Sequence, residues 1–173
     1  DYEIRKIIES RKKDIKDYIT NLSDEEIMSN QDEIIIHNMN EKYKFILVEI
    51  KDELIENRKI SKETIKKPNM FYSRNDPYES PYWLVDGVKI TCQFPFIGDE
   101  LLFYCSASTF SLSGHPEIDL YDNYFCISAS ETLDTMAKEE NKELLFNKIN
   151  RDLKDIKDFI EYRNSDARTF NSQ

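Results

Sequence analysis

Glycine and histidine are scarce in this sequence, and their scarcity excludes several kinds of functional site. The 173 residues include only 3 glycines and 2 histidines. Phosphate-binding loops need closely spaced glycines, because backbone amides must approach the phosphates with no side chain in the way. Neither His37 nor His115 has a second histidine or a cysteine at zinc-finger spacing. We therefore expect no classical nucleotide loop, no metal site and no cofactor.

Long apolar runs are absent, and cysteines are few. No stretch approaches the roughly 18 apolar residues that cross a bilayer, so we expect no membrane partner. Cys92, Cys105 and Cys126 form no Cys-x-x-Cys pair, and each lies in or beside an apolar stretch. This pattern predicts reduced core residues and favours a cytoplasmic protein. Because residue 1 is aspartate rather than methionine, we also expect the chain to be part of a longer protein.

Charge and aromatic side chains are abundant. Charged residues make up 34% of the chain and aromatic residues 12%, with a net charge of -10 at pH 7. The aromatic content argues against disorder, and the length fits one domain. A negative net charge repels phosphate backbones, so we do not expect this chain alone to bind nucleic acid.

Hydrophobic periodicity predicts an α+β fold that begins with helices. Apolar residues recur at three- and four-residue spacing from Tyr2 to Thr20, which is typical of an amphipathic helix. Ser23 and Glu26 have the spacing of a capping box that starts a short helix. Asn30 and Glu33 repeat a related start signal. The buried side of that further helix should consist of Ile34, Ile35, Met39 and Tyr43.

The middle of the chain carries the strand signals. Residues 45–50 are apolar and partly β-branched, which predicts a central strand. Asp86-Gly87, with a valine on either side, predicts a tight hairpin. Three further strands are expected, at residues 101–105, 117–120 and 124–128. The last two should form an antiparallel meander, because only a short turn-like segment joins them.

These elements give one α+β domain with helices at both ends of an antiparallel sheet. Its parts are a mostly helical part at 1–67, a connector at 68–81, a β-rich part at 82–130 and a long helix at 134–171. The long helix carries apolar residues at helical spacing, namely Leu145, Ile149, Leu153, Ile156 and Ile160. We expect it either to cross the sheet or to pair with a second copy in a homodimer.

One pair of residues suggests an enzyme. Glu49 and Lys51 end the predicted strand 45–50, as in metal-dependent nucleases, where a carboxylate binds Mg²⁺ and a lysine orients the attacking water. The mechanism needs another acidic ligand, and the candidates Asp32 and Asp52 lie in predicted helix and connector. A Mg²⁺-dependent nuclease is therefore the alternative function.

A loop-dense, aromatic segment between Phe94 and Ser113 suggests binding instead of catalysis. Binding residues often lie on loops that a rigid sheet holds in place. We therefore predict a non-catalytic binding, sensing or assembly module with a protein partner. Its candidate surface comprises Phe94, Phe96, Asp99, Phe103, Phe110 and His115.

Several stretches of the sequence match a pattern known from other proteins. They are Pro-Phe-x-Gly-Asp-x-x-Leu-Phe at 95–103, Ser-x-Ser-Thr-Phe-Ser-Leu-Ser at 106–113, Phe170-Asn171, Ser-Asp-Glu-Glu-Ile at 23–27 and Glu-Lys-Tyr at 41–43. The chain thus resembles an accessory region of bacterial proteins, some of which carry a restriction-endonuclease-like nuclease domain after it. The resemblance implies a non-catalytic part of a defence or mobile-element protein, with the nuclease C-terminal to Gln173. No catalytic residue is carried over.

Overall fold

The computed structural model of the chain divides into two compact units. Unit 1 comprises Asp1–Ile50, Phe96–His115 and Ile156–Gln173, and unit 2 comprises Lys51–Pro95 and Pro116–Asp155. The structure describes residues 2–29, 32–51, 58–72, 78–108, 116–138, 141 and 143–173. Two of the four crossings between the units fall inside the strand Tyr82–Ile97 and the helix Leu144–Asn171, so both elements contribute to both units.

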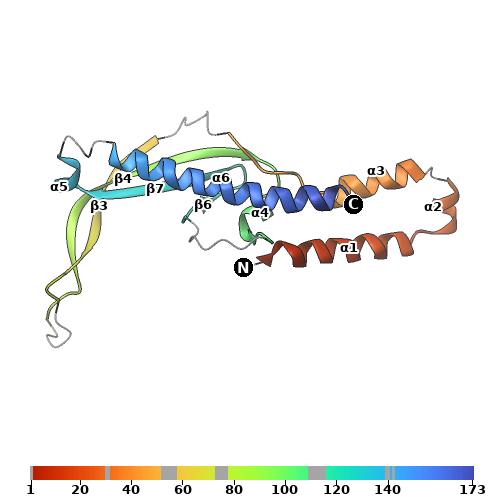
Figure 1. Cartoon of the computed structure of the whole chain (residues 1–173), viewed down its shortest axis with the longest axis horizontal. Coiled ribbons are helices and arrows are strands. Elements are labelled where there is room, and N and C mark those ends of the chain that lie inside the picture. Colours follow the sequence, from red (N-terminus) through yellow and green to blue (C-terminus); the bar gives the residue numbers. More distant parts are fainter. Residues whose placement is uncertain are drawn as a thin grey trace. The chain divides into compact units, whose positions relative to one another are not determined.

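Unit 1 begins with the predicted helices, which are α1 (Ile4–Thr20), α2 (Asp24–Ser29) and α3 (Asp32–Tyr43) (Figure 1). The capping box is confirmed: the Ser23 amide donates to Glu26 Oε2 at 3.0 Å, and the Glu26 amide donates to Ser23 Oγ at 3.2 Å. The predicted buried side of α3 is not observed, because none of its side chains is buried. Asn30 lies outside the described residues.

Two predicted strands of unit 1 are largely absent from the sheet. In place of a central strand at 45–50, only β2 (Glu49–Ile50) forms, at the edge of the sheet and antiparallel to Phe96–Ile97. In place of a strand at 101–105, a short helix α4 (Leu101–Tyr104) leads into β5 (Cys105–Ser106). Strand β5 pairs in parallel with β1 (Tyr2–Glu3). In residues 45–48, backbone groups form hydrogen bonds with side chains instead of with a neighbouring strand.

Unit 2 contains most of an antiparallel sheet. Its strands are β3 (Arg58–Pro68), β4 (Tyr82–Ile97), β6 (Asp119–Leu120) and β7 (Tyr124–Thr132). Strand β4 pairs with both β3 and β7, and β6 pairs with β7. The antiparallel meander of β6 and β7 confirms the prediction for the last two strands. Strand β3 was not predicted, since residues 58–67 were assigned to a mostly helical part.

The Asp86-Gly87 hairpin was also predicted wrongly. Both residues lie inside β4, which continues to Ile97, and the chain reverses between β3 and β4 instead. Gly87 is required for a different reason: a Cβ there would lie 2.1 Å from Ile65 Cδ1 and 3.0 Å from the carbonyl oxygen of Glu131. The missing side chain therefore makes room for Ile65 on the neighbouring strand.

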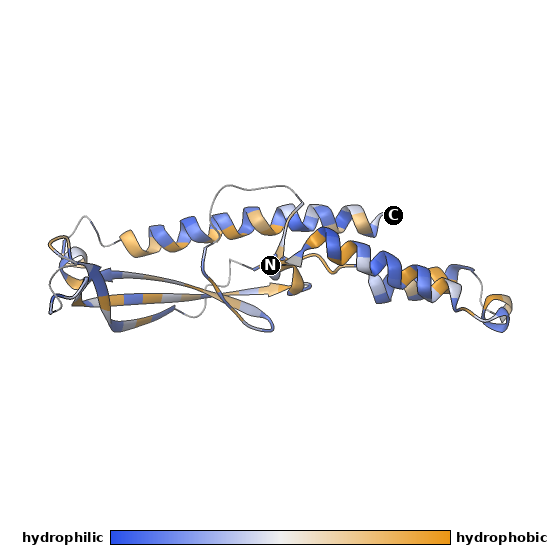
Figure 2. Ribbon diagram, turned by 90° about the horizontal axis from the view of Figure 1, so that it is seen from below, coloured by the Kyte–Doolittle hydropathy of each residue, from blue (hydrophilic) through white to orange (hydrophobic). Residues whose placement is uncertain are grey.

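The core of unit 2 is aromatic and aliphatic. Phe94 and Phe125 face each other across β4 and β7, with stacked rings 5.4 Å apart and no exposed surface. Cys92 and Cys126 are buried in the same unit, and burial raises the pKa of both thiols. Hydrophobic residues recur along β4 and β7 (Figure 2). The predicted placement of the cysteines in the core is confirmed for these two and for Cys105 in unit 1.

The long C-terminal helix is α6 (Leu144–Asn171), and the separate short helix α5 (Leu133–Met136) precedes it. The apolar stripe of α6 is buried in its own chain, through Leu145, Ile149 and Leu153 in unit 2 and Ile156 and Ile160 in unit 1. These side chains therefore have no exposed stripe to offer a second copy. Within the described ranges, no helix has both the length and the apolar character needed to cross a bilayer.

We expect Gly87→Ala to lower the free energy of unfolding by about 1–3 kcal/mol, because the added methyl group overpacks the contact with Ile65. In an Ile65→Ala background, the atoms nearest to the new Cβ are removed. In that background, Gly87→Ala should lower the free energy of unfolding by less. Urea unfolding of the original chain, the two single variants and the double variant measures this difference. Additive losses, within about 0.5 kcal/mol, would contradict this explanation.

Candidate functional site

Two asparagines of α6 hold an extended segment of unit 1. Asn171 accepts from the amide of Phe45 at 2.9 Å and donates to its carbonyl oxygen at 2.9 Å. Asn164 makes the same pair of bonds with Val48, at 2.9 and 2.8 Å. Residues seven apart lie on one face of a helix, two turns from each other. The two side chains therefore replace a neighbouring strand for residues 45–48.

Asp99 holds the residue between these two contacts. The amide of Ile46 donates to Asp99 Oδ2 at 3.1 Å, and the amide of Asp99 donates to the carbonyl oxygen of Ile46 at 2.8 Å. The preceding Gly98 has φ 114°, and a Cβ there would lie 2.3 Å from the carbonyl oxygen of Leu47. Only glycine adopts this conformation readily and leaves room for the close approach. The predicted binding residue Asp99 thus has a structural role.

Arg11 of α1 connects this segment to the helices. Its guanidinium group donates to the carbonyl oxygen of Tyr43 at 2.7 Å, lies 3.6 Å from the ring centroid of Phe45 and is 3.8 Å from Asp99 Oδ2. Burial lowers the pKa of Arg11, and the negative charge of Asp99 opposes this effect. The Phe45 ring also meets Phe170 of α6 edge-on at 5.5 Å. Helices α1, α3 and α6 are therefore tied together around Phe45.

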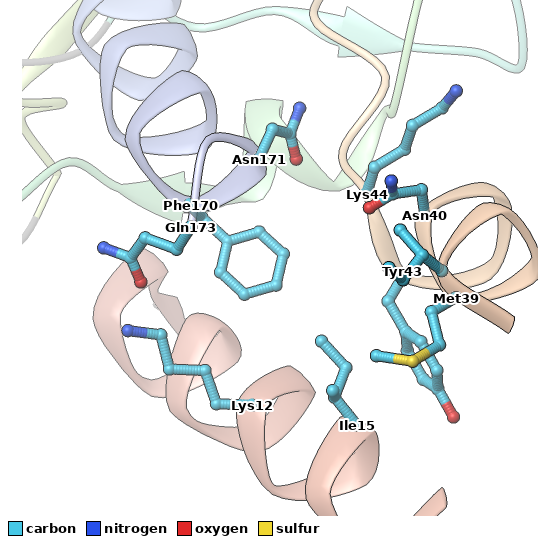
Figure 3. A pocket seen from close by; sticks show the side chains of 10 residues that line it. Lys12, Ile15, Met39, Asn40, Tyr43, Lys44, Phe170, Asn171 and Gln173 are labelled. Carbon is cyan, nitrogen blue, oxygen red and sulfur yellow. The ribbon is translucent and has the colours of Figure 1, made fainter. Parts of the chain in front are cut away.

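Beside these contacts lies a cavity of about 450 Å³. Its apolar lining consists of Ile15, Ile36, Met39, Tyr43 and Phe170. Its polar lining consists of Lys12, Asn40, Lys44, Asn171 and Gln173. Figure 3 shows the Phe170 ring and the Ile15 side chain pointing into the space between the helices, with Lys12 and Gln173 at one border. A cavity of this size and mixed character is typical of small-molecule sites.

Unit 1 also contains a buried charged side chain that sequence analysis missed. Arg163 of α6 is 7% exposed, and its guanidinium lies 5.7 Å from the ring centroid of Phe159. Among the described residues, none accepts a hydrogen bond from its Nε atom, and burial lowers the pKa of the Arg163 guanidinium. Burial likewise raises the pKa of Cys105, whose thiol donates to the carbonyl oxygen of Leu101 at 3.0 Å.

The predicted aromatic surface is divided by the structure. Phe94 is fully buried and Phe96 is 3% exposed, so both belong to the core and cannot form a recognition surface as predicted. Phe103 is half-buried, with its ring 4.7 Å from that of Phe96. Phe110 and His115 lie outside the described residues. Alternation along β4, which places Phe94 and Phe96 on one face, is the signal that would have assigned them to the core.

The residues of the nuclease alternative lie at the edge of the sheet. Glu49 is exposed in β2, and the amide of the following Lys51 donates to the carbonyl oxygen of Pro95 at 2.8 Å. Asp32 begins α3, and Asp52 is outside the described residues. Among the residues that the structure describes, no group of three or more His, Cys, Asp or Glu could hold a metal ion.

A second candidate surface lies on the two-stranded end of unit 2. Residues 82–86 of β4 pair with residues 64–68 of β3, beyond the last pair of β4 with β7 at Gly87. Large apolar side chains are exposed there and in the adjoining loop: Met70 (91%), Phe71 (80%), Tyr78 (96%), Tyr82 (50%), Trp83 (53%) and Leu84 (69%). We call this set the ribbon tip. Met70, Phe71 and Tyr78 lie in the predicted connector 68–81, and Tyr82, Trp83 and Leu84 lie in the predicted β-rich part 82–130.

Local hydrogen bonds hold the ribbon tip in place. The amide of Asn69 donates to the carbonyl oxygen of Pro81 at 2.9 Å, and its side chain donates to the carbonyl oxygen of Ser80 at 3.1 Å. Asn69 Oδ1 also accepts from the amide of Phe71 at 3.0 Å, as in an Asx-turn. The base of the loop is therefore fixed while Met70 and Phe71 remain exposed.

The comparisons with known proteins found no relatives. No family model, no curated protein and no solved structure matches the chain.

We expect Asn164→Ala to lower the free energy of unfolding by about 2–3 kcal/mol, because the amide and the carbonyl group of Val48 both lose their partner in a buried place. Asn171→Ala is the matched control, since it removes the same pair of bonds from Phe45 at a more exposed position. Its cost should be nearer about 1 kcal/mol. Urea unfolding measures both, and an equal cost would contradict the role given to burial.

Proposed function

We propose that the chain is a non-catalytic binding module that contacts a partner protein through the ribbon tip. In line with the resemblance described above, the module is accessory to a nuclease domain of a bacterial cytoplasmic protein. The observation that carries the proposal is the exposure of six large apolar side chains on the ribbon tip. Exposed apolar clusters of this kind mark interaction sites in soluble proteins.

The residue types of the ribbon tip support a protein partner. Most of its side chains are aromatic residues or methionine, which are enriched in the centres of protein interfaces. They are Met70, Phe71, Tyr78, Tyr82 and Trp83. Single-stranded nucleic acids are bound largely by stacking of bases on aromatic rings and by positive charge. Met70 and Leu84 have no ring on which a base could stack, so their exposure favours a protein partner. The net charge of -10 also opposes phosphate binding.

Charge along β3 indicates what surrounds the apolar centre of the partner. Exposed lysines of this strand are Lys59, Lys62, Lys66 and Lys67, and Glu63 is its one acidic residue. Lys66 and Lys67 pair in register with Leu84 and Trp83 of the ribbon tip. Complementary charge improves both the rate and the specificity of association. The partner surface is therefore expected to be apolar at its centre and acidic at its rim.

Photo-crosslinking in the cells that produce the protein tests this proposal. With p-benzoylphenylalanine at Phe71, we expect a discrete adduct with one protein, because this side chain would lie in the interface. The matched control places the same group at Tyr162 of α6, which is also exposed. A double variant with Lys66→Glu and Lys67→Glu should lower the yield of the adduct at position 71. A control double variant with Lys138→Glu and Lys154→Glu, which has the same change of charge, should not.

Two results would contradict the proposal. One is the absence of an adduct at Phe71, or adducts of equal yield at Phe71 and Tyr162. The other is cleavage of DNA or RNA by the purified chain with Mg²⁺ or Mn²⁺ that Glu49→Ala abolishes, which would establish the nuclease alternative.

A further inference from the structure

Helix α3 is only partly covered by the rest of unit 1, where the Tyr43 ring meets Tyr18 of α1 edge-on at 6.4 Å. None of its 12 residues is buried, although five of them are apolar or aromatic. Ile35, Met39 and Tyr43 are half-buried, whereas Ile34 and Ile36 are 46% and 56% exposed. Helices of this length are marginal in water unless an apolar face is covered. The apolar residues of α3 are therefore left partly uncovered, and three of them, Ile36, Met39 and Tyr43, line the cavity in unit 1.

The cavity is held in shape by contacts that need no ligand. Asn171 is fixed by its two bonds to Phe45, and Phe170 is fixed against the Phe45 ring. Arg11 ties α1 to the end of α3 through the carbonyl oxygen of Tyr43. The three helices that form the walls are therefore positioned in advance, which reduces the entropy cost of binding.

The charge of the cavity lining has one sign. Its charged residues are Lys12 and Lys44, and none of the lining residues is acidic. Lys44 pairs with Glu41 at 2.5 Å, whereas Lys12 has no ion-pair partner among the described residues. A second hollow on the same helices, of about 520 Å³, has the opposite character, with Asp14, Asp17 and Glu26 against Lys42. The positive lining is thus a property of this cavity and not of the helices as a whole.

We propose that the cavity between α1, α3 and the end of α6 binds a small amphipathic carboxylate. Its apolar body lies against Ile15, Met39 and Phe170, and its carboxylate lies beside Lys12 (Figure 3). The amides of Asn40 and Gln173 are further donors in the lining. This site lies in unit 1 and does not depend on the ribbon tip of unit 2.

Calorimetry with decanoate as the probe tests the ligand class. Decanoate should bind the full chain, and decanol, which has the same apolar body without the charge, should bind about tenfold more weakly or not at all. Decanoate should also raise the melting temperature, since it binds the folded state. No heat with decanoate, or equal binding of decanoate and decanol, would overturn the proposal.

Matched variants test the location. Lys12→Glu should weaken decanoate binding by about tenfold, whereas Lys13→Glu, the same change on the next residue of α1, should alter it by less than about twofold. On α3, Ile36→Ser should weaken binding and Ile34→Ser should not, because only Ile36 lines the cavity. Circular dichroism of each variant confirms that the helices remain. Equal effects within either pair would place the binding elsewhere and overturn the proposal.

Hydrogen exchange supplies a measurement that needs no substitution. Bound decanoate should slow amide exchange in α3, because it covers side chains that are otherwise open. Protection of β3 and β4 without protection of α3 would overturn the proposed site. It would leave the proposed function of the ribbon tip unaffected.

Discussion

Two side-chain amides on α6 hold the backbone of residues 45–48, and much of unit 1 depends on this contact. Asn164 and Asn171 each satisfy both backbone groups of one residue, and Asp99 satisfies those of Ile46 between them. Buried backbone groups without partners are costly, so this arrangement stabilises the extended segment without a neighbouring strand. Phe45 is thereby set between Arg11 and Phe170, which ties α1 and α3 to α6.

This constraint also explains why a strand prediction from the local sequence was wrong. Residues 45–50 have the composition of a buried strand, and an extended backbone is what the structure contains. The hydrogen bonds of that backbone go to side chains more than 100 residues away in the sequence, or to Asp99 across a glycine turn. No local pattern shows that an asparagine of a later helix will take the place of a neighbouring strand.

Other predictions succeeded or failed for equally physical reasons. Periodicity identified α6, whose apolar stripe is buried, and α1, which buries Ile4 and half-buries Ile7, Ile8, Ile15 and Tyr18. The capping box identified α2. Strand β3 was missed because its half-buried positions are Ser61, Glu63 and Ile65, of which only one is apolar. Gly87 was read as a turn residue, although its function is to leave room for Ile65. The aromatic segment near Phe94 was identified as distinctive, but alternation along β4 places two of its rings in the core.

Folding alone leaves two features of this protein without an explanation. One is α3, which forms a helix and buries none of its side chains. The other is the ribbon tip, where hydrogen bonds of Asn69 hold a loop in the shape that exposes Met70 and Phe71. Sequences usually satisfy packing, capping and polar contacts together, and departures from this consistency concentrate at functional sites. In both features apolar side chains remain uncovered although hydrogen bonds hold the adjoining backbone, through Arg11 at Tyr43 and through Asn69 at Ser80 and Phe71. A fixed apolar surface costs less entropy to bind than one that must first be ordered, and this is the physical reason for placing the two proposed binding sites here.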